Sequence, residues 1–391
     1  RSRAAHGKGP ERTSRDRSSD AGLRVQIIVI GGGPIGLIAR TALEQEGHEV
    51  RQFDPSTEKP KMSLALAEST LALLDRIGVQ LDVGEDLTEI LVNEQGLPGS
   101  MLLRASECGY PRFGRVICSL ALEAALTEHT SDRVEPLSVS QVRARSAQHN
   151  PSVELASGEM SHPDLVILAD GGRSGLTESL GLTAQRRPFD RSAIMGRIQV
   201  DTPQAGRAYE RFIGTGPLAI LPIESSTYGF VWSLDPAYAE RLIQMPETLI
   251  RALQQAVPAE LGGIEFASDP VVIPLVERWV DQPYRPGVVL IGNGAQTIHP
   301  VAGQGLNLAL RGVNLLVDAL RTQQPDDAVK TAFSQWRMNR DATRLASSSL
   351  EALFDRELFP RKLFTSFGMV FGDQSLWLKR KIAEAGMGVI S

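Results

Sequence analysis

The chain has 391 residues, of which 42% are hydrophobic and 22% are charged, and its formal net charge at pH 7 is −5. These values predict a globular protein of about two or three domains and exclude collagen, a long coiled coil and global disorder. The acidic balance argues against nucleic acid as a partner, because nucleic-acid binding normally requires a basic excess. With only Cys108 and Cys118, a disulfide framework is excluded, so a reducing, cytoplasmic location is expected.

The first segment, 1–23, is rich in Arg, Ser and Gly and holds almost no large apolar side chain. Such a segment cannot bury enough apolar surface to offset the entropy lost on ordering, so we expect a disordered tail. A transit peptide is the alternative. Glu11, Asp16 and Asp20 argue against it, because transit peptides avoid acidic residues.

The first structured unit is predicted to be a strand, a glycine-rich turn, a helix and a second strand. An apolar run at 25–30 predicts the first strand, helical spacing covers 37–46, and 48–53 predicts the second strand, which ends at Asp54. The turn between the first strand and the helix is the Gly-x-Gly-x-x-Gly motif Gly31-Gly32-Gly33-Pro34-Ile35-Gly36.

This motif predicts a dinucleotide-binding turn. Gly31 permits the tight turn, Gly33 lets backbone approach a pyrophosphate, and Gly36 allows the helix to pack closely on the strand. The helix N-terminus adds unpaired N–H groups and a partial positive charge. Asp54 lies 18 residues after Gly36 and suits a carboxylate that accepts hydrogen bonds from a ribose. These residues leave open whether the dinucleotide is FAD or NAD.

The middle of the chain predicts helices at 66–77 and 120–129 and a buried strand at 165–169. Mostly extended segments follow from 192 to 233, and a helix is predicted over 237–257. Strand 165–169 runs into the turn Asp170-Gly171-Gly172, which taken alone is as consistent with a polar turn as with a ligand contact.

A third glycine-rich stretch follows a predicted strand at 287–291 and opens a long helix that ends near residue 320. A backbone with so few large side chains can approach a flat ligand closely, and its N–H groups can stabilise negative charge on that ligand. No second Gly-x-Gly-x-x-Gly motif occurs, so an FAD at the first site leaves no separate Rossmann unit for a nicotinamide cofactor. The stretch is Gly292-Asn293-Gly294-Ala295-Gln296-Thr297-Ile298-His299-Pro300-Val301-Ala302-Gly303-Gln304-Gly305-Leu306-Asn307-Leu308.

These residues carry a resemblance to a known family. The stretch 292–308, together with 207–212 and 216–222, resembles the FAD-dependent aromatic hydroxylases of ubiquinone biosynthesis. The similarity is to their 2-polyprenyl-6-methoxyphenol hydroxylase branch, within the p-hydroxybenzoate-hydroxylase-like flavin monooxygenases. It covers 24–391 and implies an α/β fold, with a Rossmann-like FAD domain and a substrate domain on an antiparallel sheet. The implied FAD domain is 24–95, 119–186 and 277–345, the substrate domain is 96–118 and 187–276, and the C-terminal helical region is 346–391.

The resemblance also implies the chemistry. FAD is the cofactor, NADPH or NADH is a transient reductant, O₂ is a co-substrate, and no metal takes part. Reduced flavin and O₂ form a C4a-hydroperoxide, whose distal oxygen is attacked by an electron-rich, polyprenylated phenol. The protein supplies orientation and a dry site. The residues implied to contact FAD are Gly31, Gly33, Pro34, Ile35, Gly36, Asp54, Lys61, Asp170, Gly171, Gly292, Asn293, Pro300, Gly303, Gln304, Gly305, Leu306 and Asn307.

His299 is the one candidate base for the phenol, although a loop histidine that shapes the flavin site is the favoured interpretation. Several positions depart from the family's pattern, in which charged or polar residues are common: Met62 after Lys61, Cys118, Thr177, Gly312 and Ser347-Ser348. These departures raise an alternative, a weak-flavin or inactive paralogue that acts as a non-catalytic assembly partner in the same pathway. An NAD-dependent dehydrogenase would leave the stretch 292–307 without a purpose.

The segment 358–381 mixes large apolar residues with Arg361, Lys362, Lys379, Arg380 and Lys381. An apolar face with a basic rim suits a helix in a membrane interface, so peripheral membrane association is one expectation. A C-terminal helical cap on the core is the equal alternative. The family resemblance further implies a complex with other ubiquinone-pathway proteins.

Overall fold

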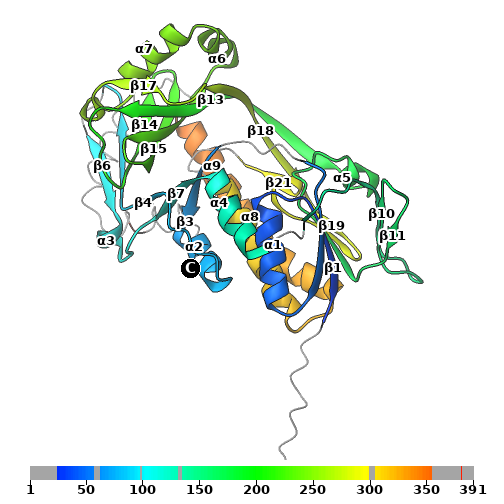
Figure 1. Cartoon of the computed structure of the whole chain (residues 1–391). Coiled ribbons are helices and arrows are strands. Elements are labelled where there is room, and N and C mark those ends of the chain that lie inside the picture. Colours follow the sequence, from blue (N-terminus) through cyan, green and yellow to red (C-terminus); the bar gives the residue numbers. More distant parts are fainter. Residues whose placement is uncertain are drawn as a thin grey trace, which may run out of the picture.

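The computed structural model describes residues 24–56, 62–96, 99–130, 134–298, 304–354 and 380. Figure 1 shows a helix-covered body below, which contains the N-terminal strand, and a second body above, which is built on a large sheet. Two long strands, β13 (Ala184–Val200) and β18 (Val271–Val280), run between the two bodies.

The lower body is organised by a six-stranded sheet in the order β19-β20-β12-β1-β2-β8. The strands from β20 to β8 are parallel neighbours, and only β19 at the edge is antiparallel. The strands are β1 (Gln26–Ile30), β2 (Glu49–Phe53), β8 (Val134–Glu135), β12 (Leu165–Leu168), β19 (Tyr284–Arg285) and β20 (Val288–Leu290).

Alternation along β1 explains why both faces of this sheet are covered. Ile27 and Val29 pack in one cluster with helices α1, α4 and α8, whereas Ile28 and Ile30 pack in another cluster with Val142 and Val153 of a small second sheet. The helices around this body are α1 (Pro34–Gln45), α2 (Glu68–Arg76), α4 (Ser119–Thr130), α5 (Leu176–Ser179), α8 (Gln304–Leu320) and α9 (Pro325–Phe354).

Two three-stranded sheets complete the lower body and its junction with the upper one. The first has the order β11-β10-β9 and the second β3-β7-β4. Their strands are β9 (Val139–Arg143), β10 (Ser152–Leu155), β11 (Met160–Ser161), β3 (Ser63–Ala67), β4 (Glu85–Leu87) and β7 (Gly114–Cys118).

The upper body is a nine-stranded sheet in the order β21-β18-β13-β16-β15-β14-β5-β6, with β17 paired to β13. One face packs on α6 and α7 through Tyr228, Phe230 and Trp232, which are buried. The other face packs on the β3-β7-β4 sheet. The remaining elements are β5 (Glu89–Glu94), β6 (Ser100–Arg104), α3 (Ala105–Cys108), β14 (Arg207–Ile213), β15 (Gly216–Glu224), β16 (Thr227–Leu234), α6 (Pro236–Ile243), α7 (Pro246–Ala256), η1 (Ala259–Leu261), β17 (Ile264–Phe266), η2 (Gly292–Gly294) and β21 (Gln296–Thr297).

Two predicted helices differ from the observed ones. The segment predicted as one helix over 237–257 is two helices, because Pro246 lacks the N–H that a continuing helix would use and begins α7 at its first turn. The helix predicted from residue 66 begins at Glu68, because Leu66 and Ala67 pair with β7 as part of β3.

Two strands near the predicted domain boundaries pair with distant parts of the chain. β5 lies in the segment 24–95 that is predicted for the FAD domain, and it pairs with β14 and β6 in the large sheet. β7 lies in the segment 96–118 that is predicted for the substrate domain, and it pairs with β3 and β4. Pairing partners far along the chain, rather than neighbouring sequence, decide which sheet a strand joins.

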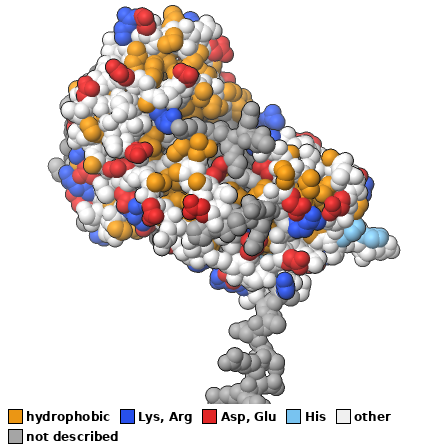
Figure 2. Space-filling view, in the orientation of Figure 1, with side chains coloured by type: hydrophobic (Ala, Val, Ile, Leu, Met, Phe, Trp, Pro, Cys, Tyr) orange, Lys and Arg blue, Asp and Glu red, His pale blue; other side chains and the backbone are white. Residues whose placement is uncertain are grey.

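The surface in Figure 2 has acidic and basic side chains interspersed, and neither sign dominates this face. Within the ranges described, no helix is long and apolar enough to cross a bilayer. The segment 358–381 lies outside the described residues except for Arg380, so its expected membrane contact stays a prediction.

Candidate functional site

The first glycine-rich turn leaves room where a ligand phosphate is expected. Gly31 has a φ of +117°, and a Cβ there would lie 2.4 Å from the carbonyl oxygen of Ala169. A Cβ on Gly36 would lie 2.2 Å from the carbonyl oxygen of Gly31. A Cβ on Gly33, by contrast, meets no described atom within 4 Å. Two glycines are therefore required for packing, whereas Gly33 borders open space.

The helix that follows this turn offers an uncapped N-terminus. Gly33 is the N-cap of α1, no side chain caps the first turn, and Pro34 occupies the start of the helix. The first backbone N–H groups of a helix have no partner within it, and the helix dipole makes this end attractive to anions. Together with the open space beside Gly33, this end of α1 fits a pyrophosphate.

One side chain of β2 and one from the residue that follows it hold the turn in place. Gln52 is fully buried, and its Nε2 donates to the carbonyl oxygen of Gly31 at 2.8 Å. Asp54 accepts from the backbone N–H of Gly32 at 2.8 Å and from that of Ser56 at 3.0 Å. The sequence does not indicate this role of Gln52, because β2 reads Glu-Val-Arg-Gln-Phe and one more polar residue in such a strand is no signal of a contact.

The three glycine-rich turns, each at the carboxyl end of a neighbouring parallel strand, lie against one another. Gly31 adjoins the backbone of Ala169 and Asp170, and a Cβ on Gly292 would lie 2.7 Å from Cδ1 of Ile35. Gly294 faces the backbone of Gly172, at 3.5 Å from a built Cβ. Residues separated by more than 250 positions thus form one cradle, at the sheet edge where open α/β folds bind ligands.

Within the cradle, Asp170 shapes its own turn. Its Oδ1 accepts from the N–H of Gly172 at 2.9 Å, and its Oδ2 accepts from the N–H of Ser174 at 3.2 Å and from the Ser174 hydroxyl. Gly171 and Gly172 both have positive φ, near +70°, which glycine adopts without strain. The carboxylate of Asp170 therefore supports the backbone that borders the cradle.

Arg278 of β18 joins two of the turns. Its Nη1 donates to the carbonyl oxygens of Asn293 at 3.0 Å and Gly294 at 2.8 Å. The same nitrogen would lie 2.7 Å from a Cβ on Gly172, so the guanidinium fills the space that this glycine leaves. Sequence reasoning missed Arg278, because nothing in its own strand indicates a contact with these turns.

Replacing Arg278 with methionine is expected to weaken dinucleotide binding about tenfold. The change removes a charged donor from two carbonyl oxygens, and hydrogen bonds to charged groups contribute about 1.5–3 kcal/mol. Titration of the apoprotein with FAD, followed by flavin fluorescence, measures the effect. The matched control is Arg285→Met, because Arg285 also donates to backbone carbonyl oxygens, those of Gly181 and Tyr284, away from the cradle. Equal flavin affinity in the two variants would contradict the role given to Arg278.

The start of α8 is bound to β3 by Asn307. Its side chain is buried, and its Nδ2 donates to the carbonyl oxygen of Ala65 at 2.9 Å. Its Oδ1 accepts from the N–H of Ala67 at 2.9 Å and from the hydroxyl of Thr70 at 2.8 Å. The side chain of Asn307 thus positions the N-terminus of α8, at the end of the third turn.

Some predicted contact residues are placed only in part. Gly305 and Leu306 lie in the first turn of α8, where both are partly buried, and the helix begins at Gln304. Lys61, His299, Pro300 and Gly303 lie outside the described residues, and their roles stay predictions.

Four of the departures from the family pattern have described surroundings. Met62 is 39% exposed, Cys118 ends β7 opposite Ser63, and Thr177 is buried in α5. Gly312 lies beneath an indole, because a Cβ there would be 3.2 Å from the ring of Trp336. A larger residue at 312 would have to displace Trp336, whose Nε1 donates to the carbonyl oxygen of Leu308. Ser347 and Ser348 lie in α9, and their side chains are outside the described set.

A family model described as "FAD binding domain" matches residues 24–343. The chain is 24% identical to the 3-demethoxyubiquinol 3-hydroxylase of Escherichia coli (strain K12), over 93% of this chain and 98% of that one. It is 26% identical to a protein of Rhodospirillum rubrum named Ubiquinone hydroxylase UbiL, over 98% and 92% of the two chains. The crystal structure of p-nitrophenol 4-monooxygenase PnpA from Pseudomonas putida DLL-E4 matches with a TM-score of 0.76 at 16% identity, over 93% and 98%. This last likeness confirms the expected fold class.

Proposed function

Because this chain belongs to the FAD binding domain family, we propose that it hydroxylates the aromatic ring of a polyprenylated phenol on the route to ubiquinone. Its expected class, an FAD-dependent, oxygen-using flavoprotein monooxygenase, is confirmed by the family match and by the hydroxylases and monooxygenases that it resembles. FAD as the cofactor is confirmed in the same way. The substrate is the proposed part.

The observation that carries the proposal is the cradle formed by the three glycine-rich turns. The open space beside Gly33 and the uncapped start of α1 fit the pyrophosphate, and Asp54 stands at the end of β2 where a ribose is expected. When bound, FAD supplies the redox chemistry that activates O₂. The protein itself must hold the flavin, orient the phenol and exclude water from the site.

The third turn and α8 orient the reactive end of the cofactor in this proposal. Asn307 fixes the start of α8 against β3, and β3 in turn contacts the large sheet, where Ser63 would lie 2.9 Å from a Cβ on Gly229. The substrate is thereby expected between the N-terminus of α8 and the sheet face that packs on β3-β7-β4. The named ubiquinone hydroxylases among the relatives support a phenol of that pathway.

The purified protein, tested with NADPH, O₂ and a short-chain prenylphenol, provides the decisive experiment. We expect a flavin absorption spectrum, its bleaching by NADPH without oxygen, and a hydroxylated product by mass spectrometry when oxygen is admitted. A protein that takes up no added FAD, or holds FAD that NADPH cannot reduce, would instead support the non-catalytic assembly partner. Association with pathway proteins or with a membrane is a separate proposal that co-purification and liposome sedimentation test.

A further inference from the structure

Glu210 is an acidic residue in the large sheet whose surroundings differ from those of its neighbours. It lies in β14, paired with Ala219 of β15 and Val92 of β5. Its Oε1 is buried and has no hydrogen-bond partner, and no hydrogen bond or ion pair joins the carboxyl group to a described residue. The residue as a whole is partly exposed, although this carboxyl oxygen is buried.

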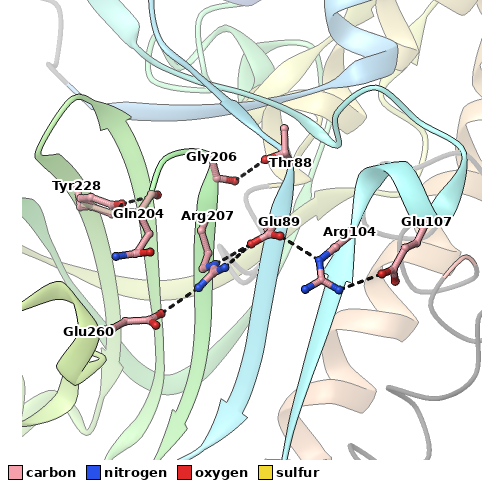
Figure 3. Close-up of polar contacts among 9 residues, drawn as sticks. All are labelled: Thr88, Glu89, Arg104, Glu107, Gln204, Gly206, Arg207, Tyr228 and Glu260. Atoms are coloured by element: carbon pink, nitrogen blue, oxygen red, sulfur yellow. Dashed lines mark hydrogen bonds and ion pairs between the residues drawn. The ribbon is translucent and has the colours of Figure 1, made fainter. Parts of the chain in front are cut away.

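The contrast with Glu89, on the neighbouring strand, shows how unusual this is. Figure 3 shows Glu89 between Arg207 and Arg104, with Glu260 and Glu107 completing a chain of ion pairs. Burial acts to raise the pKa of Glu89, but the hydrogen bonds from the two arginines hold that pKa below its ordinary value. Burial without any such partner raises the pKa of Glu210 to about 7. The ion pair between Arg207 and Glu89 also joins β14 to β5, three residues before Glu210.

Glu210 points to the side of the sheet where the substrate is expected. Tyr209, the preceding residue, belongs to the core under α6 and α7, so alternation directs Glu210 to the opposite face. Two residues earlier on that face, Ala208 packs in the cluster that Ala65 of β3 also contacts. The carbonyl oxygen of Ala65 accepts the hydrogen bond from Asn307 at the start of α8. Glu210 therefore lies on the sheet face that packs on β3-β7-β4, and β3 in turn is bonded to α8 through Asn307.

Other charged or titratable groups lie on the same sheet face as Glu210 or on the β3-β7-β4 sheet that packs on it. On the same face, Glu94 lies two positions after Val92 in β5, and Arg197 of β13 pairs with Gly229 of β16. On the facing sheet, Glu85 accepts from the N–H of Gly206 and Cys118 ends β7. None of these bonds to the Glu210 carboxyl group.

We propose that Glu210 accepts the proton of the phenol hydroxyl when substrate binds. The O–H bond of the phenol breaks, an O–H bond forms on the carboxylate, and the electron pair stays on the phenol oxygen, where it raises the electron density of the ring. The proton then passes from the carboxyl group to water. A carboxylate suits this task only when its affinity for protons is close to the working pH, a condition that burial provides here. This inference rests on the proposed function.

Proton uptake on phenol binding gives a test that needs no turnover. The probe is 4-nitrophenol, added to FAD-loaded protein at about pH 8, because its electron-withdrawing nitro group makes it far more acidic than the phenol of Tyr and leaves it mostly ionised in water. Two adjacent negative charges are unfavourable, so wild-type protein is expected to take up about one proton per bound probe, measured by calorimetry in two buffers. Glu210→Gln is expected to take up none. The control Glu224→Gln, at an exposed end of β15, is expected to match wild type. Equal uptake in Glu210→Gln and wild type would overturn the proposal.

The pH profile of prenylphenol hydroxylation separates this inference from the proposed function. Wild-type kcat/KM is expected to fall about tenfold per pH unit below about 7, whereas Glu210→Gln is expected to lose this dependence and to run about 100-fold slower above it. Normal hydroxylation by Glu210→Gln would refute the role of Glu210 and leave the proposed function unaffected. If the wild-type protein takes up a proton with the probe but hydroxylates no prenylphenol, the proposed function is refuted, whereas proton uptake by Glu210 is retained.

Stability tests the observation on which the inference rests, namely that the Glu210 carboxyl group is buried and its Oε1 has no hydrogen-bond partner. The folded-state pKa of Glu210 is raised from 4.5 to about 7. The carboxyl group therefore favours the folded state most below about pH 4.5, and this contribution is lost as pH rises through 7. Glu210→Gln, which cannot ionise, is expected to melt at a higher temperature than wild type at about pH 8 and at the same temperature near pH 4. A lower melting temperature at pH 8 would contradict the burial of an unpaired carboxylate.

Discussion

Replacing Gly33 with valine is expected to weaken FAD binding strongly and leave the fold intact. Gly33 has φ −73° and ψ 173°, an extended conformation that any residue adopts, and a built Cβ meets no described atom within 4 Å. The valine side chain would then fill the space where the pyrophosphate is expected at the start of α1. We expect flavin affinity to fall by about 100-fold or more, which corresponds to about 3 kcal/mol of binding free energy.

The measurements are flavin content after purification, FAD titration and the urea midpoint of the apoprotein. The matched control is Gly214→Val, because a Cβ on Gly214 also meets nothing within 4 Å and this residue lies in the β14–β15 hairpin, away from the cradle. Gly36→Val is the opposite control, expected to destabilise the apoprotein itself, because its Cβ would press on the carbonyl oxygen of Gly31. A Gly33→Val protein that retains stoichiometric FAD would refute the placement of the pyrophosphate.

Replacing Asn307 with alanine is expected to lower the free energy of unfolding by about 3 kcal/mol and to weaken FAD binding as well. The change leaves the carbonyl oxygen of Ala65 and the N–H of Ala67 without their partner in a buried place, and each buried polar group left unpaired costs about 1–3 kcal/mol. It also frees the start of α8 from β3. Urea unfolding of apoprotein and holoprotein measures the two effects separately.

Asn314→Ala supplies the control for Asn307, because it lies in the same helix and its side chain bonds to Asp318 and Arg76 at the partly exposed surface. Surface changes of this kind usually alter stability by less than about 0.5 kcal/mol. Should Asn307→Ala unfold at the same urea concentration as Asn314→Ala, the bridge between α8 and β3 would not have the importance given to it here.

Much of the fold follows from local patterns in the chain. The apolar run before Gly31, the helical spacing after it and the strand ending at Asp54 lie within about 30 residues, so the sequence alone predicts the first β–α–β unit. The split of the predicted helix at Pro246 also had a local signal, the missing N–H of proline. The membership of β5 in the large sheet did not, because its partner β14 lies more than 100 residues away.

The residues of the candidate site also fall into those that local sequence predicts and those that it does not. The glycine-rich turns could be predicted, since each turn is defined by a few consecutive residues after an apolar strand. Gln52, Arg278 and Glu210 could not be assigned their places. Gln52 acts on Gly31 from the next strand, and Arg278 reaches two turns from a strand of the other body. In the sequence, Glu210 is one acidic residue in a strand of alternating pattern. Only the pairing of β14 with its neighbours shows which face of the sheet it lies on.

The sequence by itself determined the glycine-rich turns, the family and the strand-to-helix loops that are proposed to hold FAD, because these depend on the order of residues close together in the chain. Only the tertiary structure decided that three turns share one cradle, that Asn307 bridges to Ala65 across 242 positions, and that the buried Oε1 of Glu210 has no hydrogen-bond partner among the described residues. The physical reason is that burial, hydrogen bonding and pKa are set by groups that meet only when distant segments pack together.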